Sequence, residues 1–367
     1  MKRAISLMVS LTLLVALCGA VAANAAYDYF APLEAEYVQT VDSAFTMAFV
    51  GDTQNVCFEA PEKMDEIYDW IIDSKDEKNI KYVAGLGDIT DEDLDYEWEA
   101  AMAAINQLNG VIPHSIVRGN HDMIYNYGKY VNRKSPEYVA QLSGVSPEGL
   151  NSYQLLDVGT IKYLFINLDN GATDEMLAWA ASIIEQHPDR NVIVTTHSYI
   201  NEDGELLTTE NSKYPPSVKG GPGTNDGPEM WDGLIRKYAN IVMVVCGHIG
   251  AAPEVVAYEM IGDHGNKIQN VLVDPQSADA HAGLLGLVAL FHFSADGKQV
   301  QVENYSTLQN DHYGPGITFE LECLGGNANA GAMNWPLLVG IGIGVLVIAA
   351  AAAVCVIVMK KKKAQAQ

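Results

Sequence analysis

Short apolar runs recur along this chain, and stretches with helical spacing separate them. Each run ends in polar residues or glycine, which is typical of buried strands. The runs are Phe45–Val50, the first half of Ile80–Asp91, His114–Arg118, Val192–Thr196 and Ile241–Cys246. The helices predicted from apolar residues at three- and four-residue spacing are Glu59–Lys75, Leu94–Leu108, Glu175–Gln186 and Glu229–Ala239. Strands that alternate with helices predict an α/β fold.

Other parts of the pattern depart from this alternation. Tyr153–Asp157 and Lys162–Asn167 predict a hairpin, because a short turn containing Gly159 separates them. The antiparallel strands expected near the end of the domain are Val255–Met260, Lys267–Asp274, Leu287–Phe293 and Val300–Tyr305. Residues 123–150 are expected to form a surface excursion. Asn201–Pro228 is rich in Gly, Pro, Asn and Asp and predicts a long loop. Residues 27–322 are therefore predicted to form one α/β domain.

The N-terminal stretch has a different character. Residues 1–25 contain Lys2 and Arg3, then the apolar run Leu7–Val21, and end in Ala23-Asn24-Ala25. A basic start, an apolar stretch and small residues at the end predict a secretory signal peptide.

The C-terminal stretch predicts a membrane anchor. Residues 336–359 carry no charge, and this length of about 24 residues is enough to cross a bilayer core of about 30 Å as a transmembrane helix. Lys360–Lys363 follow directly and predict that residues 360–367 form a cytoplasmic tail. Residues 323–335 are expected to be a linker. The domain would then be extracellular, held at the cell membrane by a single pass.

Charge excludes some partners. The chain has 22 basic and 46 acidic residues, and six of the basic ones lie in the predicted signal peptide and tail. The remaining 16 basic residues against 46 acidic ones give the domain a net charge of −30. Such a surface repels nucleic acid, so no nucleic-acid partner is expected. The domain's cysteines, Cys57, Cys246 and Cys323, are odd in number and irregularly spaced, which argues against a disulfide framework.

Polar residues that can bind metal ions follow five of the predicted strands. In chain order they are Asp52 with Gln54, Asp88 with Asp91, Asn120 with His121, His197, and His248. Ligands bind outside the carboxyl ends of the strands in open α/β sheets. Carboxylate, amide and imidazole groups are ligands of divalent metal ions. One such cluster alone is more often a turn or a buried histidine, but five in succession favour a shared metal site.

The order of these clusters resembles the signature of the calcineurin-like metallophosphoesterase family. The family's motifs are Asp-x-His, Gly-Asp-x-x-Asp, Gly-Asn-His-Asp/Glu, a lone His and Gly-His-x-His. The matching positions are Gly51–Gln54, Gly87–Asp91, Gly119–Asp122, His197 and Gly247–Gly250. The resemblance covers about residues 45 to 305. It implies a two-sheet β-sandwich flanked by helices (α/β/β/α), with a two-metal site at the carboxyl edge.

The resemblance also implies a role for each site residue. The implied metal ligands are Asp52, Gln54, Asp88, Asn120, His197 and His248. Asp52 and Gln54 would hold the first ion, Asp88 would bridge both, and the other three would complete the second site. His121 would give a proton to the leaving oxygen, with Asp91 orienting and charging its ring. The ions, expected to be Mn, Fe or Zn, would supply a hydroxide that hydrolyses a small phosphate mono- or diester.

Two positions depart from the family pattern, and both belong to the first metal. Gln54 stands where histidine is commonest, and Gly250 stands where the last histidine of Gly-His-x-His is expected. Asp274, Gln276 and His281 follow or end a later strand and could replace that histidine, although nothing in their spacing selects one.

Two functions remain open from the sequence. The first is a membrane-anchored, metal-dependent phosphoesterase, favoured by the complete Asn120-His121 pair. The second is an inactive homologue that holds metal as a binding or adhesion module, which the glycine at 250 favours. A purely structural surface domain would leave all five clusters unexplained.

Overall fold

The computed structural model describes residues 36–250 and 255–324. The predicted signal peptide, the membrane span, the tail and most of the linker lie outside these ranges. Among the described residues, no helix combines the length and the apolar character that crossing a bilayer requires.

The first of two seven-stranded sheets has the order β13-β12-β11-β1-β2-β3, and β14 also pairs with β12. Its strands are β1 (Phe45–Val50), β2 (Ile80–Gly85), β3 (His114–Ile116), β11 (Leu287–Phe293), β12 (Gln299–Ser306), β13 (Asp311–His312) and β14 (Ile317–Glu320). Strands β1, β2 and β3 are parallel, and β11 is antiparallel to β1. The three parallel strands therefore end at one edge.

The second seven-stranded sheet has the order β4-β5-β6-β7-β8-β10-β9. Its strands are β4 (Gly144–Val145), β5 (Ser152–Val158), β6 (Ile161–Asn167), β7 (Asn191–Thr195), β8 (Ile241–Cys246), β9 (Val255–Ile261) and β10 (Lys267–Val273). The predicted hairpin is confirmed as β5 and β6. Strand β10 was expected to be purely antiparallel, but it is antiparallel only to β9 and parallel to β8. Its carboxyl end therefore lies level with that of β8.

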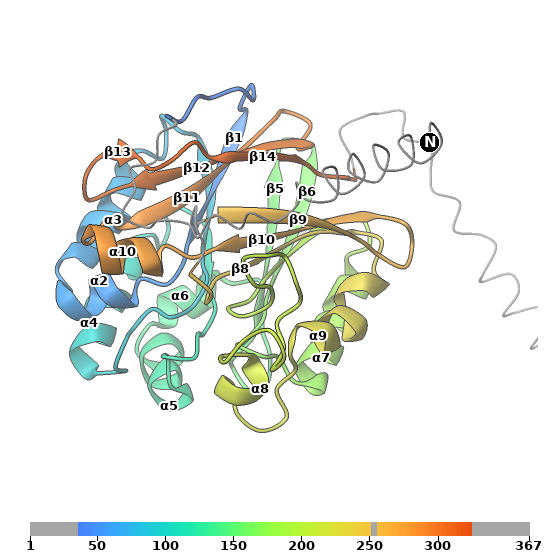
Figure 1. Cartoon of the computed structure of the whole chain (residues 1–367), viewed down its shortest axis with the longest axis horizontal. Helices are drawn as coiled ribbons and strands as arrows, with labels where there is room; N and C mark the ends of the chain where they lie inside the picture. The colour runs from blue at the N-terminus through green and yellow to red at the C-terminus, as the bar shows by residue number, and fades with distance from the viewer. Residues whose placement is uncertain (1–35, 251–254, 325–367) are drawn as a thin grey trace, which may run out of the picture. The chain divides into compact units, whose positions relative to one another are not determined.

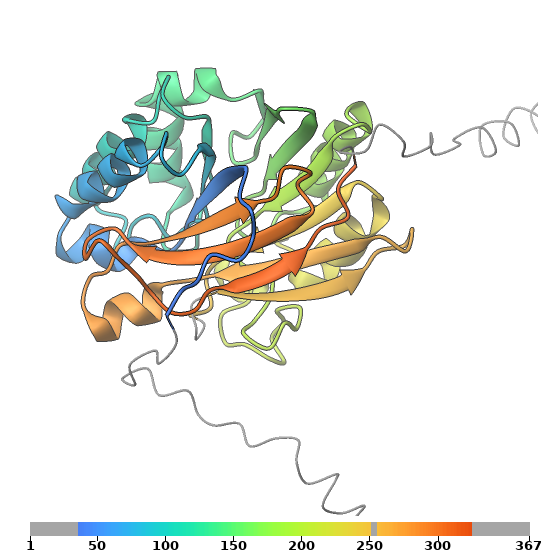
Figure 2. The same cartoon turned by 90° about the horizontal axis from the view of Figure 1, so that it is seen from above.

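The two sheets pack face to face through an apolar layer, which confirms the predicted fold class (Figure 2). Phe49 and Phe291 of the first sheet are fully buried in one cluster with Phe165 and Val245 of the second. Tyr82 stacks on Phe165 with ring centroids 3.8 Å apart. Side chains alternate along a strand, so the intervening residues of β1 point to the opposite face, where helices cover them.

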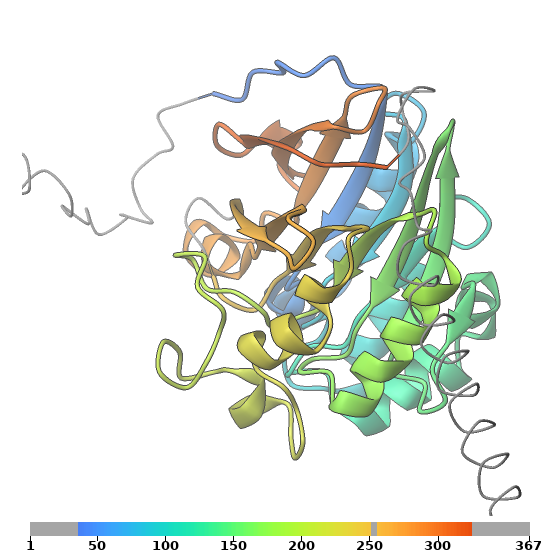
Figure 3. The same ribbon diagram turned by 90° about the vertical axis from the view of Figure 1, so that its right-hand side faces the viewer.

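Helices cover the outer face of each sheet (Figure 1). Helices α3 (Lys63–Asp73) and α4 (Asp95–Asn106) pack their apolar residues on the first sheet. Helices α7 (Asp174–Gln186) and α9 (Gly227–Gly233) pack on the second sheet and stand in front of it in Figure 3.

Two helical predictions need correction. The helix expected over Glu59–Lys75 is shorter and corresponds to α3, while α2 (Gln54–Glu59), which precedes it, was not predicted. Pro61 lies between the two helices, where proline interrupts the helical hydrogen bonds. Residues 123–150 are not a surface excursion. They form α5 (Ile124–Tyr127), the π-helical segment η1 (Gly128–Arg133), α6 (Pro136–Gln141) and β4, and they bury Tyr130 and Tyr138 in the core.

The later connections follow the prediction in part. Residues 201–226 are largely irregular, as expected, with only the short helix α8 (Pro216–Lys219). The helix expected over Glu229–Ala239 is divided into α9 and the 3₁₀ turn η2 (Ile235–Lys237). Helix α10 (Gln276–Ala282), directly after β10, was not predicted.

Candidate metal centre

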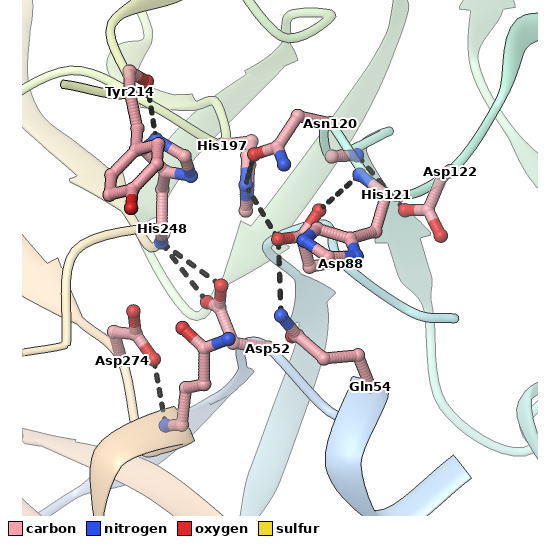
Figure 4. A network of polar contacts seen from close by, with 12 residues as sticks. Asp52, Gln54, Asp88, Asn120, His121, Asp122, His197, Tyr214, His248 and Asp274 are labelled. Carbon is pink, nitrogen blue, oxygen red and sulfur yellow. Dashed lines mark hydrogen bonds and ion pairs between the residues drawn. The ribbon is translucent and has the colours of Figure 1, made fainter. Parts of the chain in front are cut away.

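Polar residues from the carboxyl ends of six strands meet at one place (Figure 4). In strand order they are Asp52 after β1, Asp88 after β2, Asn120 after β3, His197 after β7, His248 after β8 and Asp274 after β10. Both sheets contribute three, so the centre lies between them. Gln54 enters from the start of α2.

The backbone is strained where these side chains leave the strands. Asp52, Asp88 and His248 have positive φ angles of 49°, 45° and 78°, and they are three of the six non-glycine residues in the described ranges with this conformation. Positive φ costs of order 1–3 kcal/mol for such residues, and it persists where the surrounding structure imposes it. Holding these three residues in position therefore lowers the stability of the fold.

Glycine is required beside two of the ligands. A Cβ atom on Gly87 would lie 2.7 Å from His197 Nδ1, and one on Gly119 would lie 2.1 Å from the backbone nitrogen of Asp88. Gly87 also has a φ of 93°. Because any side chain would collide here, these glycines let the loops after β2, β3 and β7 approach one another.

The predicted second-metal ligands converge closely. His197 Nδ1 donates to the Leu86 carbonyl oxygen at 2.9 Å, which leaves Nε2 facing the site. Nε2 lies 3.1 Å from Asn120 Oδ1 and 3.2 Å from Asp88 Oδ2. One ion with bonds of about 2.1 Å holds neighbouring ligand atoms at about this separation. A ligand atom of His248 joins those of Asp88 and His197, all within 4.8 Å of one another.

A loop contact fixes the orientation of His248. Its Nε2 donates to the Tyr214 carbonyl oxygen at 2.6 Å, so Nδ1 is left as the potential ligand atom. Its ring meets that of His197 edge to face, with centroids 4.8 Å apart. Backbone carbonyls thus set the tautomer of both imidazoles, which is the usual outer-shell arrangement of metal-ligating histidines. The irregular segment 201–226 has this structural role.

The predicted first-metal ligands lie on the other side of Asp88. Both carboxylate oxygens of Asp52 accept the backbone N–H of His248, at 3.1 and 3.2 Å. The Gln54 amide nitrogen donates to Asp88 Oδ2 at 3.3 Å, while its Oε1 is buried without a hydrogen-bond partner. Asp88 is thus adjacent to both groups of ligands.

Buried carboxylates dominate the electrostatics of the centre. Burial, together with the neighbouring charges of Asp274 and Asp88, raises the pKa of Asp52 well above its usual value. Burial raises the pKa of Asp274 to about 7. Burial also acts to raise the pKa of Asp88, but the charge and hydrogen bond of His197 outweigh it and lower the pKa to about 2. Such crowding of negative charge is relieved by bound cations.

His121 lies beside the centre and is partly open to solvent. Its Nδ1 donates to the backbone carbonyl of Asp91 at 2.7 Å, and the Asp91 carboxylate is farther away, at 3.3 Å. Both the main chain and the carboxylate of Asp91 therefore contact the ring, and the main chain makes the shorter contact. The backbone N–H of His121 donates to Asp88 Oδ1 at 2.9 Å, so the loop is tied to the metal ligands.

The family model for calcineurin-like phosphoesterases matches residues 45–251, which is more than half of the chain. The chain belongs to the calcineurin-like phosphoesterase family. The predicted resemblance is confirmed, and with it membership of a group of hydrolases that act on phosphoester bonds.

Three relatives illustrate how far the similarity to individual proteins extends. The uncharacterized protein YvnB of Bacillus subtilis is 26% identical over 278 residues, which are 73% of this chain and 20% of YvnB. The purple acid phosphatase PPD1 of yellow lupin seeds has a TM-score of 0.46 at 14% identity, over 79% of this chain and 55% of that one. A 5'-nucleotidase precursor of Thermus thermophilus has a TM-score of 0.41 at 12% identity, over 76% and 54%. The chain thus spans about a fifth of YvnB and about half of each enzyme.

Every predicted site residue of this calcineurin-like phosphoesterase domain lies at the same edge, and their individual roles stay predictions. The donor set fits two metal ions. Carboxylate, amide and imidazole groups meet here, and two of their oxygens, Gln54 Oε1 and Asp274 Oδ2, are buried with no hydrogen bond. Buried polar atoms of this kind are otherwise paired, because leaving one unpaired costs about 1–3 kcal/mol. The identity of the ions also stays a prediction.

One residue that the sequence analysis missed organises the loops. The buried carboxylate of Asp122 accepts the backbone N–H groups of Gly119, Ile89 and Thr90, at 3.0–3.1 Å. It thereby ties the loop after β2 to the loop after β3. The sequence signal for this role was the position of Asp122 as the last residue of the Gly-Asn-His-Asp motif.

A buried ion pair supports the same loop and was also missed. Arg118 pairs with Asp169 through two hydrogen bonds, at 2.7 and 3.0 Å, and donates to the carbonyl oxygens of Gly119 and Asp122. Asp169 follows β6 as the other site residues follow their strands. The criterion used for the five clusters would have found it.

Proposed function

We propose that this protein is a metal-dependent phosphoesterase that hydrolyses a small phosphate mono- or diester. The observation that carries the proposal is the convergence of Asp88, Asn120, His197 and His248, with His121 beside them. A site built only to bind metal has no need of a half-exposed imidazole tied by its backbone to a ligand carboxylate.

The ligand residues would hold two ions. Asn120, His197 and His248 would hold one with Asp88, and Asp52 and Gln54 would hold the other, with Asp88 shared between them. When bound, two such ions supply positive charge beside the phosphoryl oxygens and lower the pKa of bound water. The buried positions of Asp52, Asp88 and His197 exclude bulk water from their outer side and keep their orientation fixed.

His121 would act as the general acid. Its Nδ1–H is committed to the Asp91 carbonyl, so its Nε2 is the ring atom that can meet the substrate. As water attacks phosphorus it would release a proton to solvent, the bond to the leaving oxygen would break, and a proton on Nε2 would pass to that oxygen. General acid catalysis of this kind contributes about 10²–10⁴-fold to the rate.

The proposal includes a location. The basic and apolar stretch at residues 1–25 and the uncharged stretch at 336–359, followed by four lysines, support an exported domain on a single membrane anchor. Protease added to intact cells should cleave the domain and spare a C-terminal tag on the tail. Protection of the domain until the cells are opened would contradict this location.

The activity can be tested with a matched pair of variants. The full-length chain, loaded with Mn²⁺ or Zn²⁺, should release nitrophenol from aryl phosphate mono- or diesters. His121→Ala should lower kcat by about 10²–10⁴-fold. The control is His264→Ala, because His264 is exposed and its ring donates to the Lys237 carbonyl oxygen. Equal activity of both variants would refute the role of His121.

The alternative is a binding or adhesion module that holds metal without turnover. It predicts that metal binds with no hydrolysis of any phosphate ester by the loaded wild type. Turnover that is sensitive to His121→Ala and not to His264→Ala would exclude it.

A further inference from the structure

A side chain at the position expected to carry the last histidine would collide with Ser277 unless Ser277 moved. A Cβ atom on Gly250 would lie 2.1 Å from Ser277 Oγ and 3.2 Å from Ser277 Cβ. Ser277 belongs to α10, which the Gly-His-x-His signature does not foresee. The first residue of α10 is Gln276, and its carbonyl oxygen accepts a hydrogen bond of 3.1 Å from the Asn55 side chain, which holds the start of the helix beside the site. Helix α10 therefore fills the space beside Gly250.

The same segment brings a carboxylate to the centre. Strand β10 is the parallel neighbour of β8, and Leu272 pairs with Cys246. Two residues on, Asp274 is therefore level with His248. The Val273 carbonyl oxygen lies so close to Gly51 and Gly247 that a Cβ there would be 2.7 and 3.3 Å from it. The end of β10 is thus packed directly against the loops of Asp52 and His248.

One carboxylate oxygen of Asp274 is free to bind a ligand. The residue is fully buried, and its Oδ1 accepts the backbone N–H of Gln276 at 2.7 Å. Its Oδ2 is buried with no hydrogen-bond partner. Figure 4 shows Asp274 on the Asp52 side of the centre, with one unlabelled side chain between the two carboxylates in this view. A buried anionic oxygen without a donor is costly, and a bound cation would satisfy it.

We infer that Asp274 replaces the missing histidine as a ligand of the first metal ion, through Oδ2, together with Asp52, Gln54 and Asp88. This inference rests on the metal centre of the proposed function. The first site then has only oxygen donors, whereas the second keeps two imidazoles. Oxygen-only sites suit hard ions such as Mn²⁺ or Mg²⁺, and imidazole suits Zn²⁺, so the two sites would differ in their preferred metal.

The test counts metal ions in the full-length chain after chelation, with Mn²⁺ as the probe and free Mn²⁺ followed by electron paramagnetic resonance. Wild type should bind two ions. Asp274→Asn, which keeps the shape and the hydrogen bond from Gln276, should weaken one site by at least about 100-fold and leave the other unchanged, because outer-shell changes alone cost 10–100-fold. The same loss of affinity at one site is expected for Asp274→Ala.

The matched control is Asp279→Asn. Asp279 is a buried aspartate of the same helix, but its carboxylate accepts the backbone N–H of Leu285. The Asp279→Asn variant should bind two Mn²⁺ ions, as the wild type does. Metal-free Asp274→Asn should also melt at a higher temperature than metal-free wild type, because one of two adjacent buried carboxylates is gone; a lower melting temperature would count against the inference.

The outcomes separate the two proposals. Two wild-type sites in Asp274→Asn would overturn the inference and leave the phosphoesterase intact. A wild type with one site, abolished by His197→Ala, would also overturn the inference alone. A wild type that binds neither Mn²⁺ nor Zn²⁺ would overturn the metal centre and the inference together.

Discussion

Asp88 connects most of the parts of the centre. Its Oδ2 lies 3.2 Å from His197 Nε2 and 3.3 Å from the Gln54 amide nitrogen, while Oδ1 accepts the backbone N–H of His121. Its own backbone is held at positive φ. These contacts come from residues far apart in the sequence, so the position of one carboxylate depends on several loops. Gly87, directly before it, makes that arrangement possible.

We predict that Gly87→Ala is among the most damaging single-methyl changes in the domain. Strain at its φ of 93° and the collision with His197 Nδ1 should together cost more than about 3 kcal/mol in the free energy of unfolding, measured in urea. Gly110→Ala is the control, because Gly110 has a φ of 74° with no atom within 4 Å of an added Cβ. It should cost only about 1–2 kcal/mol, from strain alone. Similar losses in both variants would contradict the close approach at Gly87.

The buried ring of His114 should make the stability of the fold depend on pH, independently of the metal centre. Burial lowers the pKa of its ring to about 4. Its Nδ1 donates to the Ile112 carbonyl oxygen, and its Nε2 is buried without a partner. The unfolded chain, with an ordinary histidine pKa, takes up the proton first as pH falls. The stability that the neutral ring allows should therefore decline from about pH 6.5 to about pH 4, by about 3 kcal/mol, and level off below.

The measurement compares wild type with His114→Asn by urea unfolding at several pH values. The difference in unfolding free energy between the two should shrink across that window. The exposed His264→Asn should track the wild type. A pH-independent difference for His114→Asn would show that the ring is not buried in its neutral form.

Between elements, the loops after β2 and β3 act as one unit because Asp122 holds them together. Three backbone N–H groups and the Thr90 hydroxyl donate to its carboxylate. The Arg118–Asp169 pair holds the same loop from the second sheet's side. The loops that carry Asp88 and Asn120 are thus held by residues outside the predicted ligand set.

Asp122→Ala should therefore lower metal affinity and kcat/KM by about 10–100-fold, the usual effect of losing support behind metal ligands. Isothermal titration with Mn²⁺ and steady-state kinetics would measure both. Thr90→Val removes only the hydroxyl bond, which is 2.9 Å long, and should cost about 1 kcal/mol of stability with little loss of affinity. Full Mn²⁺ affinity in Asp122→Ala would mean that the loops hold their positions without it.

The sequence predicted the strands and their polar ends well because both signals are local. Apolar runs such as Ile241–Cys246 and the residues after them can be read without the rest of the chain. Contacts that depend on packing were not accessible. The helices in 123–150 are stabilised by burying Tyr130 and Tyr138 against the core, and α10 is held by Asn55, which is far away in the sequence. The shorter contact from His121 goes to a main-chain carbonyl, which has no sequence signal.

For the molecule as a whole, metal ions and folding should be linked. The domain combines a large negative charge with Asp52, Asp88 and Asp274 buried at one edge. Ions that bind only the folded state stabilise it, by about 2.7 kcal/mol for each site at a concentration a hundred times the dissociation constant. The melting temperature should therefore rise with Mn²⁺ and fall on chelation. Asp88→Asn should lose most of that dependence, and an equal response in the variant would locate the stabilising ions elsewhere.

The proposed function requires side chains from five strand ends to surround two metal ions. The decisive test is anomalous diffraction from crystals of the wild-type protein grown with Mn²⁺, at a wavelength where manganese scatters anomalously. We predict two peaks about 3.5–4 Å apart. One should lie among Asp88, Asn120, His197 and His248, and the other beside Asp52, Gln54 and Asp88. No peak at this edge, or manganese bound only at exposed carboxylates, would contradict it.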